Sequence, residues 1–332
     1  APTTDILDDL IFGVYKAALV KGAIELEVFA KVAAGQTTAE AMARTNGWDS
    51  RCTRLMLDGL CSLKLLAKTG GVYRLTTVSE TFLIPGHLGY VGAFTLHDMA
   101  WEARGRYAQS VQTGIPAMGD MAAPNQSPLW EIFSQVGLNR DSLSRSVDSA
   151  RELWETVGVN RRTVPGARVL DLACGKGIKT LTLAKLDPEA TVTGIDWENV
   201  LRTTAQVAQI LGVSDRVTLV PGDILTADFG QSEYDVVFMG NITYYFKPEQ
   251  NVSLFSRAHT ALKPAGRLVI NAPMVDEERC TSEYLLYSAM FVLESPAGDT
   301  YTFSEYRRML EASGFERIYR YEHPWGLLSA RK

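Results

Sequence analysis

The feature that most constrains the fold is an apolar stretch that passes through a glycine turn into a second apolar stretch. The sequence GARVLDLACGKGIKTLTLA covers residues 166–184, and its part 169–173 is apolar enough for a buried strand. Gly175 and Gly177 let the backbone approach a ligand without a Cβ in the way, and the next helix begins with free N–H groups. Asp196, nineteen residues after Gly177, ends the following predicted strand, where its carboxylate can accept from both hydroxyls of a ribose. The segment predicts half of a nucleotide-binding α/β fold.

The glycine turn departs from the dinucleotide pattern. A nicotinamide site needs a third small residue, as in G-x-G-x-x-G/A, so that helix and strand pack closely, but Thr180 holds that position here. Asp171, inside the strand, is also unusual for such a site. A tight turn without any ligand is the plainer interpretation of so short a motif. As a whole, D-x-A-C-G-x-G resembles motif I of the class I S-adenosylmethionine-dependent methyltransferases.

The sequence after the turn alternates strands and helices. Strands are predicted at 216–220, 234–239, 267–272, 316–322 and 325–331, and helices at 248–262 and 303–313. The strand YDVVFM at 234–239 is continuously apolar, as buried parallel strands are. We therefore predict an α/β fold with a Rossmann-like, seven-stranded methyltransferase sheet.

The N-terminal part carries short helices and a hairpin. Residues 37–40 (TTAE) offer a capping box for a helix that ends at 46–47 (NG). A second helix begins at Asp49 or Ser50, and the turn TGG at 69–71 joins two short strands. Helix, turn, helix and hairpin in this order predict a mainly α-helical, winged-helix domain.

A winged helix taken alone suggests DNA binding, but the charges argue against it. The second helix offers Arg51, Arg54 and Lys64 against Asp49 and Asp58. That balance makes a poor phosphate-binding surface. In the small-molecule methyltransferases that this part resembles, the winged helix is a dimerisation domain, and the apolar helix expected over 6–32 would pack against a partner subunit. We expect a homodimer, with the dimerisation domain at 1–100 and a helical acceptor-binding linker plus the methyltransferase domain at 101–332.

Composition narrows the class further. A chain of 332 residues exceeds a single domain of roughly 100 to 200, and the 46% hydrophobic content can fill two cores. A net charge of −5 argues against nucleic acid as the main partner. The apolar segment 11–34 is interrupted by five charged residues, so no membrane span or membrane partner is predicted. The four cysteines lack metal-ligand spacing, so we expect no metal and a reducing, cytoplasmic setting.

Three further segments make the resemblance more specific. DWENVL at 196–201, ALKP at 261–264 and GDTYTF at 298–303 are similar to the bacterial, natural-product branch of the O-methyltransferase-like family. The resemblance implies S-adenosyl-L-methionine as cofactor and S-adenosyl-L-homocysteine as product. The residues that it assigns to the cofactor are Asp171, Ala173, Gly175, Gly177, Asp196, Trp197, Gly222, Asp223, Ile224 and Asn241. It places the glycines at the methionine end, Asp196 at the ribose, Asp223 with Ile224 at the adenine and Asn241 beside the sulfonium, while Asp171 braces the turn.

The sequence departs from the family where the base is usually found. Relatives usually carry a histidine two or three residues beyond Asn241, but this chain reads NITYYF at 241–246. The acid that supports such a histidine is replaced by Asn271. A positioned base contributes roughly 10²- to 10⁴-fold, whereas alignment with an activated methyl donor can supply much of the acceleration alone. We therefore expect an acceptor atom that is already nucleophilic.

Two residues are candidates for a catalytic role. Tyr244 replaces the usual base and could orient the acceptor or, with a lowered pKa, take its proton; alternatively it only fills the space of the histidine. His97, in FTLHDM at 94–99, falls on helices that line the acceptor pocket in this family, although lone helical histidines are more often packed or solvated.

Aromatic residues are the candidates for the acceptor wall. Tyr284, Tyr287 and Phe291 are spaced to share one helical face, and such a stripe is often simply core. The acceptor-binding residues that we predict are Trp101, Trp130, Phe133, Tyr245, Tyr284, Tyr287 and Phe291. The predicted function is methylation of an oxygen, carbon or nitrogen on a small, mostly apolar natural product. The alternatives are a member of the family that binds the cofactor for a non-methylating reaction, a cofactor-sensing winged-helix regulator and a nicotinamide oxidoreductase.

Overall fold

The structure is a computed structural model, and it describes residues 3–87, 90–92, 95–96, 100–136 and 138–332. The chain folds into two compact units. The first contains residues 1–101 and 135–142, and the second contains 102–134 and 143–332.

The first unit consists of short helices and one hairpin. Its elements are α1 (Asp5–Glu25), α2 (Val28–Ala33), α3 (Ala39–Asn46), α4 (Ser50–Ser62), β1 (Leu66–Thr69), β2 (Val72–Leu75) and α5 (Thr77–Phe82). The order of helices and hairpin predicted from the sequence is confirmed. Thr38, rather than Thr37, caps α3 by accepting from the Ala41 N–H at 3.1 Å, and Gly47 ends that helix in the left-handed conformation.

The single helix predicted over 6–32 is wrong. The chain leaves helical geometry at Glu27, whose φ of 53° separates α1 from α2. The break lets Phe29 turn into a core with Met42, Leu57 and Tyr73, all at most 1% exposed. Tertiary packing therefore overrides the uninterrupted helical pattern of the sequence.

The second unit is built on a mixed sheet in the order β5-β4-β3-β6-β7-β9-β8. The strands are β3 (Arg168–Leu172), β4 (Thr191–Asp196), β5 (Val217–Pro221), β6 (Tyr234–Gly240), β7 (Leu262–Asn271), β8 (Glu316–Tyr321) and β9 (Leu327–Arg331). β3 to β7 are parallel to one another, and β9 is antiparallel to both β7 and β8. The predicted seven-stranded α/β fold is confirmed.

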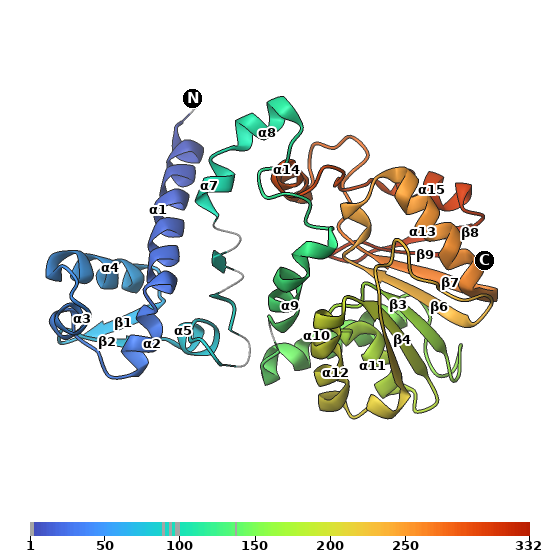
Figure 1. Ribbon diagram of the computed structural model, residues 1–332, viewed down its shortest axis with the longest axis horizontal. Helices are drawn as coiled ribbons and strands as arrows, with labels where there is room; N and C mark the ends of the chain where they lie inside the picture. The colour runs from blue at the N-terminus through green and yellow to red at the C-terminus, as the bar shows by residue number, and fades with distance from the viewer. Residues whose placement is uncertain (1–2, 88–89, 93–94, 97–99, 137) are drawn as a thin grey trace. The chain divides into compact units, whose positions relative to one another are not determined.

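Helices cover both faces of this sheet. Those packed on its strands are α11 (Ile178–Leu186), α12 (Glu198–Leu211), α13 (Pro248–Ala261) and α15 (Phe303–Ala312). The chain after residue 100 also forms α7 (Trp101–Arg104), α8 (Tyr107–Thr113), α9 (Ser127–Gln135), α10 (Arg140–Thr156) and α14 (Tyr284–Glu294). α13 and α15 lie together on one face, and α11 and α12 lie on the other (Figure 1). Leu170, Leu268 and Ile270, none of them exposed, belong to the core of this unit.

Two strands begin more than one residue away from their predicted start. β7 begins at Leu262 instead of 267, although Ala265 has a φ of 62° and the pairing register with β6 shifts beside it. β9 begins at Leu327 instead of 325, which leaves Trp325 in a loop. No helix in the described part of the chain is both long and apolar enough to cross a membrane.

Candidate functional site

The turn between β3 and α11 has an unusual backbone. Ala173, Gly175 and Gly177 have φ values of 55°, 55° and 66°. A Cβ on Gly177 would lie 2.9 Å from Thr204 Cγ2, so this position requires glycine. A Cβ on Gly175 would have no neighbour within 4 Å, so the space above this residue is open to a ligand. Thr204 fixes the turn from α12 by donating its hydroxyl to the Gly175 carbonyl at 2.5 Å.

Asp196 joins this turn to the end of the neighbouring strands. Its Oδ2 accepts from the Gly175 N–H at 2.8 Å and its Oδ1 from the Trp197 N–H at 2.7 Å. The Gly222 N–H donates to the Asp196 carbonyl at 2.9 Å, which brings the loop after β5 alongside. Burial raises the pKa of Asp196 to about 6, against the lowering effect of the two N–H groups. Each carboxylate oxygen keeps a lone pair, so both hydroxyls of a ribose can still donate to it.

The loop after β5 is held in one conformation. Asp223 Oδ1 accepts from the Leu225 N–H at 2.8 Å, and Ile224 is 5% exposed. Arg257 of α13 donates to the carbonyls of Ile224 and Leu225 at 2.8 and 2.9 Å, and its guanidinium lies 4.0 Å from the ring centre of Phe229. No sequence motif marks Arg257, because its role depends on reaching a loop of another element.

Asp171 braces the turn from within the sheet. It is 2% exposed, and the hydroxyl of Thr180 donates to its Oδ2 at 2.5 Å. Burial raises the pKa of Asp171 to about 7. Burial also lowers the pKa of the nearby Lys179 to about 8, an effect that Asp171 opposes. Thr180, the residue that breaks the dinucleotide pattern, is therefore the partner that a buried carboxyl at 171 requires.

Asn241 follows β6 and contacts a residue that the sequence analysis placed in a strand. Asn241 has a φ of 56°, and its side-chain oxygen accepts from the indole N–H of Trp325. The Trp325 ring centre lies 5.2 Å from that of Tyr284 and 6.4 Å from that of Tyr287. Pro324 and Gly326 on either side of Trp325 are the turn signal that could have revealed this loop.

An aromatic cluster surrounds Tyr244, the residue that we predicted to replace the usual base. Its members are Trp130, Phe133, Tyr244, Tyr245, Tyr287 and Phe291. The ring centre of Tyr244 lies 4.8 Å from Tyr245, 5.5 Å from Phe291 and 5.8 Å from Tyr287, and Tyr245 lies 5.5 Å from Trp130. Tyr244, Tyr245 and Phe291 are at most 5% exposed, whereas Tyr287 is 39% exposed. Burial raises the pKa of Tyr244 well above its usual value, so its phenol stays neutral.

The remaining predicted site residues lie outside this cluster. Tyr284 begins α14 and donates to the Pro324 carbonyl. Trp101 is 38% exposed and belongs to the first unit. Asn271 donates to the Gly326 carbonyl at 2.7 Å. His97 lies outside the described residues. Among the described residues, no three His, Cys, Asp or Glu side chains are grouped as a metal site would need.

Comparison with known proteins shows which family the chain resembles. Residues 8–85 match the O-methyltransferase dimerisation domain, and residues 169–266 match a methyltransferase domain. The chain is 26% identical over 324 residues to 3-hydroxy-5-methyl-1-naphthoate 3-O-methyltransferase of Streptomyces sahachiroi, covering 94% of this chain and 90% of that protein. It is also 26% identical to acetylserotonin O-methyltransferase of Rattus norvegicus, covering 94% and 73%.

Solved structures share the fold across the whole chain. An O-methyltransferase family protein from Burkholderia thailandensis has a TM-score of 0.80 at 19% identity, covering 100% of this chain and 98% of that one. Human N-acetylserotonin methyltransferase, solved with S-adenosylmethionine, has a TM-score of 0.71 at 21% identity, covering 99% and 97%. The chain therefore belongs to the S-adenosylmethionine-dependent O-methyltransferase family that joins an N-terminal dimerisation domain to a methyltransferase domain, and it is a methyltransferase of small molecules.

Proposed function

We propose that this enzyme methylates a small, mostly apolar, aromatic acceptor without a general base at the family's histidine position. The observation that carries the proposal is the environment of Tyr244. This residue stands where relatives carry histidine, is 4% exposed and is packed among other rings, and burial raises its pKa. A phenol in that state donates a hydrogen bond at neutral pH and does not accept a proton.

The cofactor residues fit S-adenosylmethionine. The open space above Gly175 accommodates the methionine end, the free lone pairs of Asp196 the ribose hydroxyls, and Asp223 with Ile224 the adenine. The Trp197 N–H fixes the Asp196 carboxylate that receives the ribose, and the Gly222 N–H holds the backbone carbonyl of the same residue. When bound, the cofactor supplies a methyl group on a positively charged sulfur, which needs no further activation.

The protein contributes alignment and exclusion of water. Asn241 directly follows β6 and accepts a hydrogen bond from Trp325. It precedes Tyr244 of the aromatic cluster by three residues. We assign Asn241 to the position next to the transferred methyl. We assign the aromatic cluster, together with Tyr284 and Trp325, to the wall against which a flat acceptor rests. Trp101 as an acceptor-binding residue and His97 as a catalytic residue stay proposals.

The acceptor needs a nucleophile that is already reactive. With no base beside it, an acidified phenol or enol, a neutral amine or an activated carbon is methylated faster than an ordinary phenol of pKa near 10. Two relatives are named for naphthoate and acetylserotonin methylation, which both involve aromatic acceptors. We favour an acidified aromatic hydroxyl as the acceptor.

The assembly that fits the dimerisation domain is a homodimer. We place the dimerisation function within residues 1–100 and acceptor binding and methyl transfer within 101–332. The apolar side chains Ile6, Leu10 and Phe12 of α1 are each at least 58% exposed in the single chain, and a second copy would cover them.

The test is a comparison of phenolic acceptors with graded pKa values. Turnover, followed as S-adenosylhomocysteine release at fixed pH, should rise as the acceptor pKa falls from about 10 to about 7, because the fraction of phenolate rises. A rate that does not change across this series would contradict the proposal and indicate a base in the protein. Consumption of the acceptor with S-adenosylmethionine left intact would instead support a non-methylating member of the family, which the loss of both histidine and acid also allows.

A further inference from the structure

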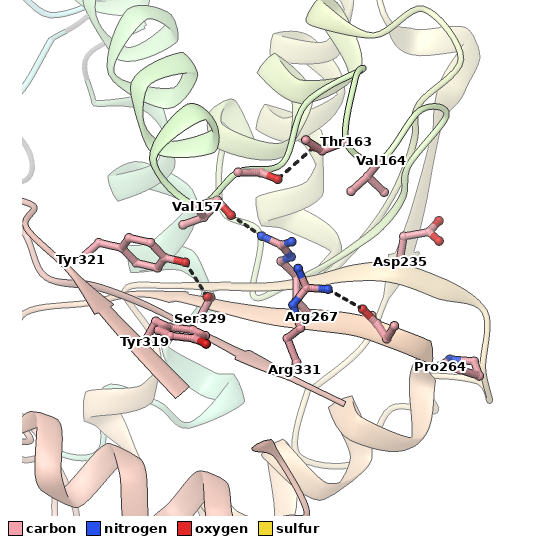
Figure 2. A pocket seen from close by; sticks show the side chains of 13 residues that line it. Val157, Thr163, Val164, Asp235, Pro264, Arg267, Tyr319, Tyr321, Ser329 and Arg331 are labelled. Carbon is pink, nitrogen blue, oxygen red and sulfur yellow. Dashed lines mark hydrogen bonds between the residues drawn. The ribbon is translucent and has the colours of Figure 1, made fainter. Parts of the chain in front are cut away.

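A pocket opens in the methyltransferase unit, away from the glycine turn. It has a volume of about 540 Å³ and is lined by thirteen residues, with the turn after α10 on one side and β7, β8 and β9 on the other (Figure 2). Gly266 and Arg267 lie in the first half of β7, whereas the glycine turn follows the carboxyl end of β3. The pocket and the cofactor site are therefore at opposite ends of the parallel strands, and its volume is typical of small-molecule sites.

Two arginines face each other in this pocket. Arg267 of β7 and Arg331 of β9 are direct partners in the antiparallel register. Two like charges in directly opposite positions destabilise a strand pair. Arg267 is 9% exposed, and burial together with the charge of Arg331 lowers its pKa. Arg267 donates to the Val157 carbonyl, and Arg331 donates to the Ala265 carbonyl at 3.4 Å (Figure 2). Within the part of the chain that the structure describes, these backbone carbonyls are the hydrogen-bond acceptors of the two guanidinium groups.

The nearby acids do not neutralise this pair. Asp235 lines the pocket, but its two oxygens accept from Lys263 Nζ at 2.9 and 2.8 Å, and Oδ2 also accepts from the Arg168 N–H at 2.9 Å. Glu316 is the register partner of Arg331 on β8 and is exposed to solvent. Among the described residues, no carboxylate lies within ion-pair distance of either guanidinium. The pocket therefore keeps positive charge and free guanidinium N–H donors.

Tyrosine side chains form the wall beside the arginines. Tyr319 and Tyr321 of β8 both line the pocket, and the Tyr321 hydroxyl lies 3.0 Å from the Ser329 hydroxyl. Tyr319 is 54% exposed, so its ring offers a flat surface at the entrance. A fork of guanidinium donors next to an aromatic face suits a planar molecule that carries an oxyanion.

We propose that this pocket is a second ligand site that binds a small organic oxyanion, either a carboxylate or a phosphate ester, on a planar body. The oxyanion lies between Arg267 and Arg331, and the planar body lies along Tyr319. Binding there replaces the repulsion between the two guanidinium groups with two charge-assisted contacts.

The test is calorimetric binding to the full-length protein with S-adenosylhomocysteine at saturation, so that the cofactor site is filled. The probes are phenyl phosphate and benzoate, with phenol as the uncharged control. At least one of the two anions should bind with a dissociation constant of about 1 mM or tighter, and phenol should not bind. The tighter of the two anions then identifies the oxyanion as a phosphate ester or a carboxylate.

Variants locate the binding. Arg331→Gln should lower the affinity for the tighter-binding probe at least tenfold. Arg320→Gln should leave that affinity unchanged, because Arg320 is exposed on the same hairpin and does not line the pocket. Without anion, Arg331→Gln should melt at the wild-type temperature or above, since one of two repelling charges is gone. Tyr319→Ala, at an exposed position, is a second variant and should also lower the affinity for this probe. Absence of binding by the wild type at about 10 mM of either anion, or unchanged affinity in both pocket variants, would overturn the proposal.

Discussion

At the scale of single residues, Asp196 carries the strongest expectation. Asp196→Ala removes the carboxylate that would accept from both ribose hydroxyls and that also receives the Gly175 and Trp197 N–H groups. Each charge-assisted hydrogen bond contributes roughly 1.5 to 3 kcal/mol at most, so the affinity for S-adenosylhomocysteine should fall at least tenfold by calorimetry. Asp215→Ala, at an exposed acid, is the matched control. Unchanged affinity in a folded Asp196→Ala variant would refute the assignment.

Tyr244 tests the mechanism. Because its phenol is buried and stays neutral, Tyr244→Phe removes only an orienting contact and should reduce turnover by less than about tenfold, or 1.4 kcal/mol. Tyr245→Phe is the control for loss of a neighbouring hydroxyl. A decrease of about a thousandfold in Tyr244→Phe alone, with cofactor binding intact, would show that this tyrosine is the base.

Asp171 predicts a pH dependence of stability. Its pKa is raised to about 7 in the folded protein, from 3.8, so the folded state holds a proton that the unfolded state has already released. The stability that this proton contributes is present below about pH 4 and is lost as the pH rises to about 7, by up to about 4 kcal/mol. Urea unfolding of the cofactor-free protein should show wild type losing stability relative to Asp171→Asn over this range. Parallel pH profiles for the two proteins would contradict the assignment.

Only part of the site could be predicted at this scale. Gly175, Gly177, Asp196 and Asp223 follow strands that are neighbours in a parallel sheet, so motif spacing was enough to bring them together. Trp325 could not be found in this way, because it meets Asn241 from a position 84 residues further along the chain. Side chains that reach across elements depend on packing, which no local pattern records.

At the scale of elements, the strand order and most helices follow from local patterns, and the errors lie where packing decides. The break at Glu27 and the extension of β7 back to Leu262 both contradict a strong local signal, a continuous helical pattern in one case and a Lys-Pro-Ala-Gly cluster in the other. The break at Glu27 gives Phe29 a buried position. The extension of β7 gives Tyr234 of β6 a strand partner at Leu262. Such gains outweigh propensities of roughly 1 kcal/mol.

Arg257 shows how one helix holds a loop of the site. Its guanidinium donates to three backbone carbonyls of one loop, those of Ile224, Leu225 and Ala227. Arg257→Gln should therefore lower the free energy of unfolding by roughly 1 to 3 kcal/mol and weaken S-adenosylhomocysteine binding, because the loop that carries Asp223 loosens. Chemical denaturation and calorimetry measure the two effects, with Arg308→Gln on the exposed face of α15 as control. A lower free energy of unfolding with unchanged cofactor affinity would show that this loop does not bind the adenine.

At the scale of the whole molecule, we propose a ligand site at each end of the parallel strands. The carboxyl ends of the parallel strands present N–H groups and carboxylates that suit the cofactor, and the other end presents the arginine pair. The first depends on the backbone geometry of the turn after β3, and the second depends on side chains of β7 and β9. A sequence motif revealed the first end, whereas the second needed the register of an antiparallel pair.

The last prediction concerns assembly. The first half of α1 exposes many apolar side chains, and Leu7, Leu10 and Val14, which share one helical face, are between 53% and 65% exposed. Such a helix needs a partner, so the full-length chain should be a dimer at micromolar concentration, with an interface above roughly 2,000 Å². The double variant Leu10→Glu, Val14→Glu buries two charges in that interface and should shift the mass measured by light scattering to a monomer or to aggregates. Lys16→Glu adds the same side chain at an exposed polar position of α1 and should stay dimeric. A wild type that remains a monodisperse monomer, or a double variant that stays a stable dimer, would show that α1 is not the contact between subunits.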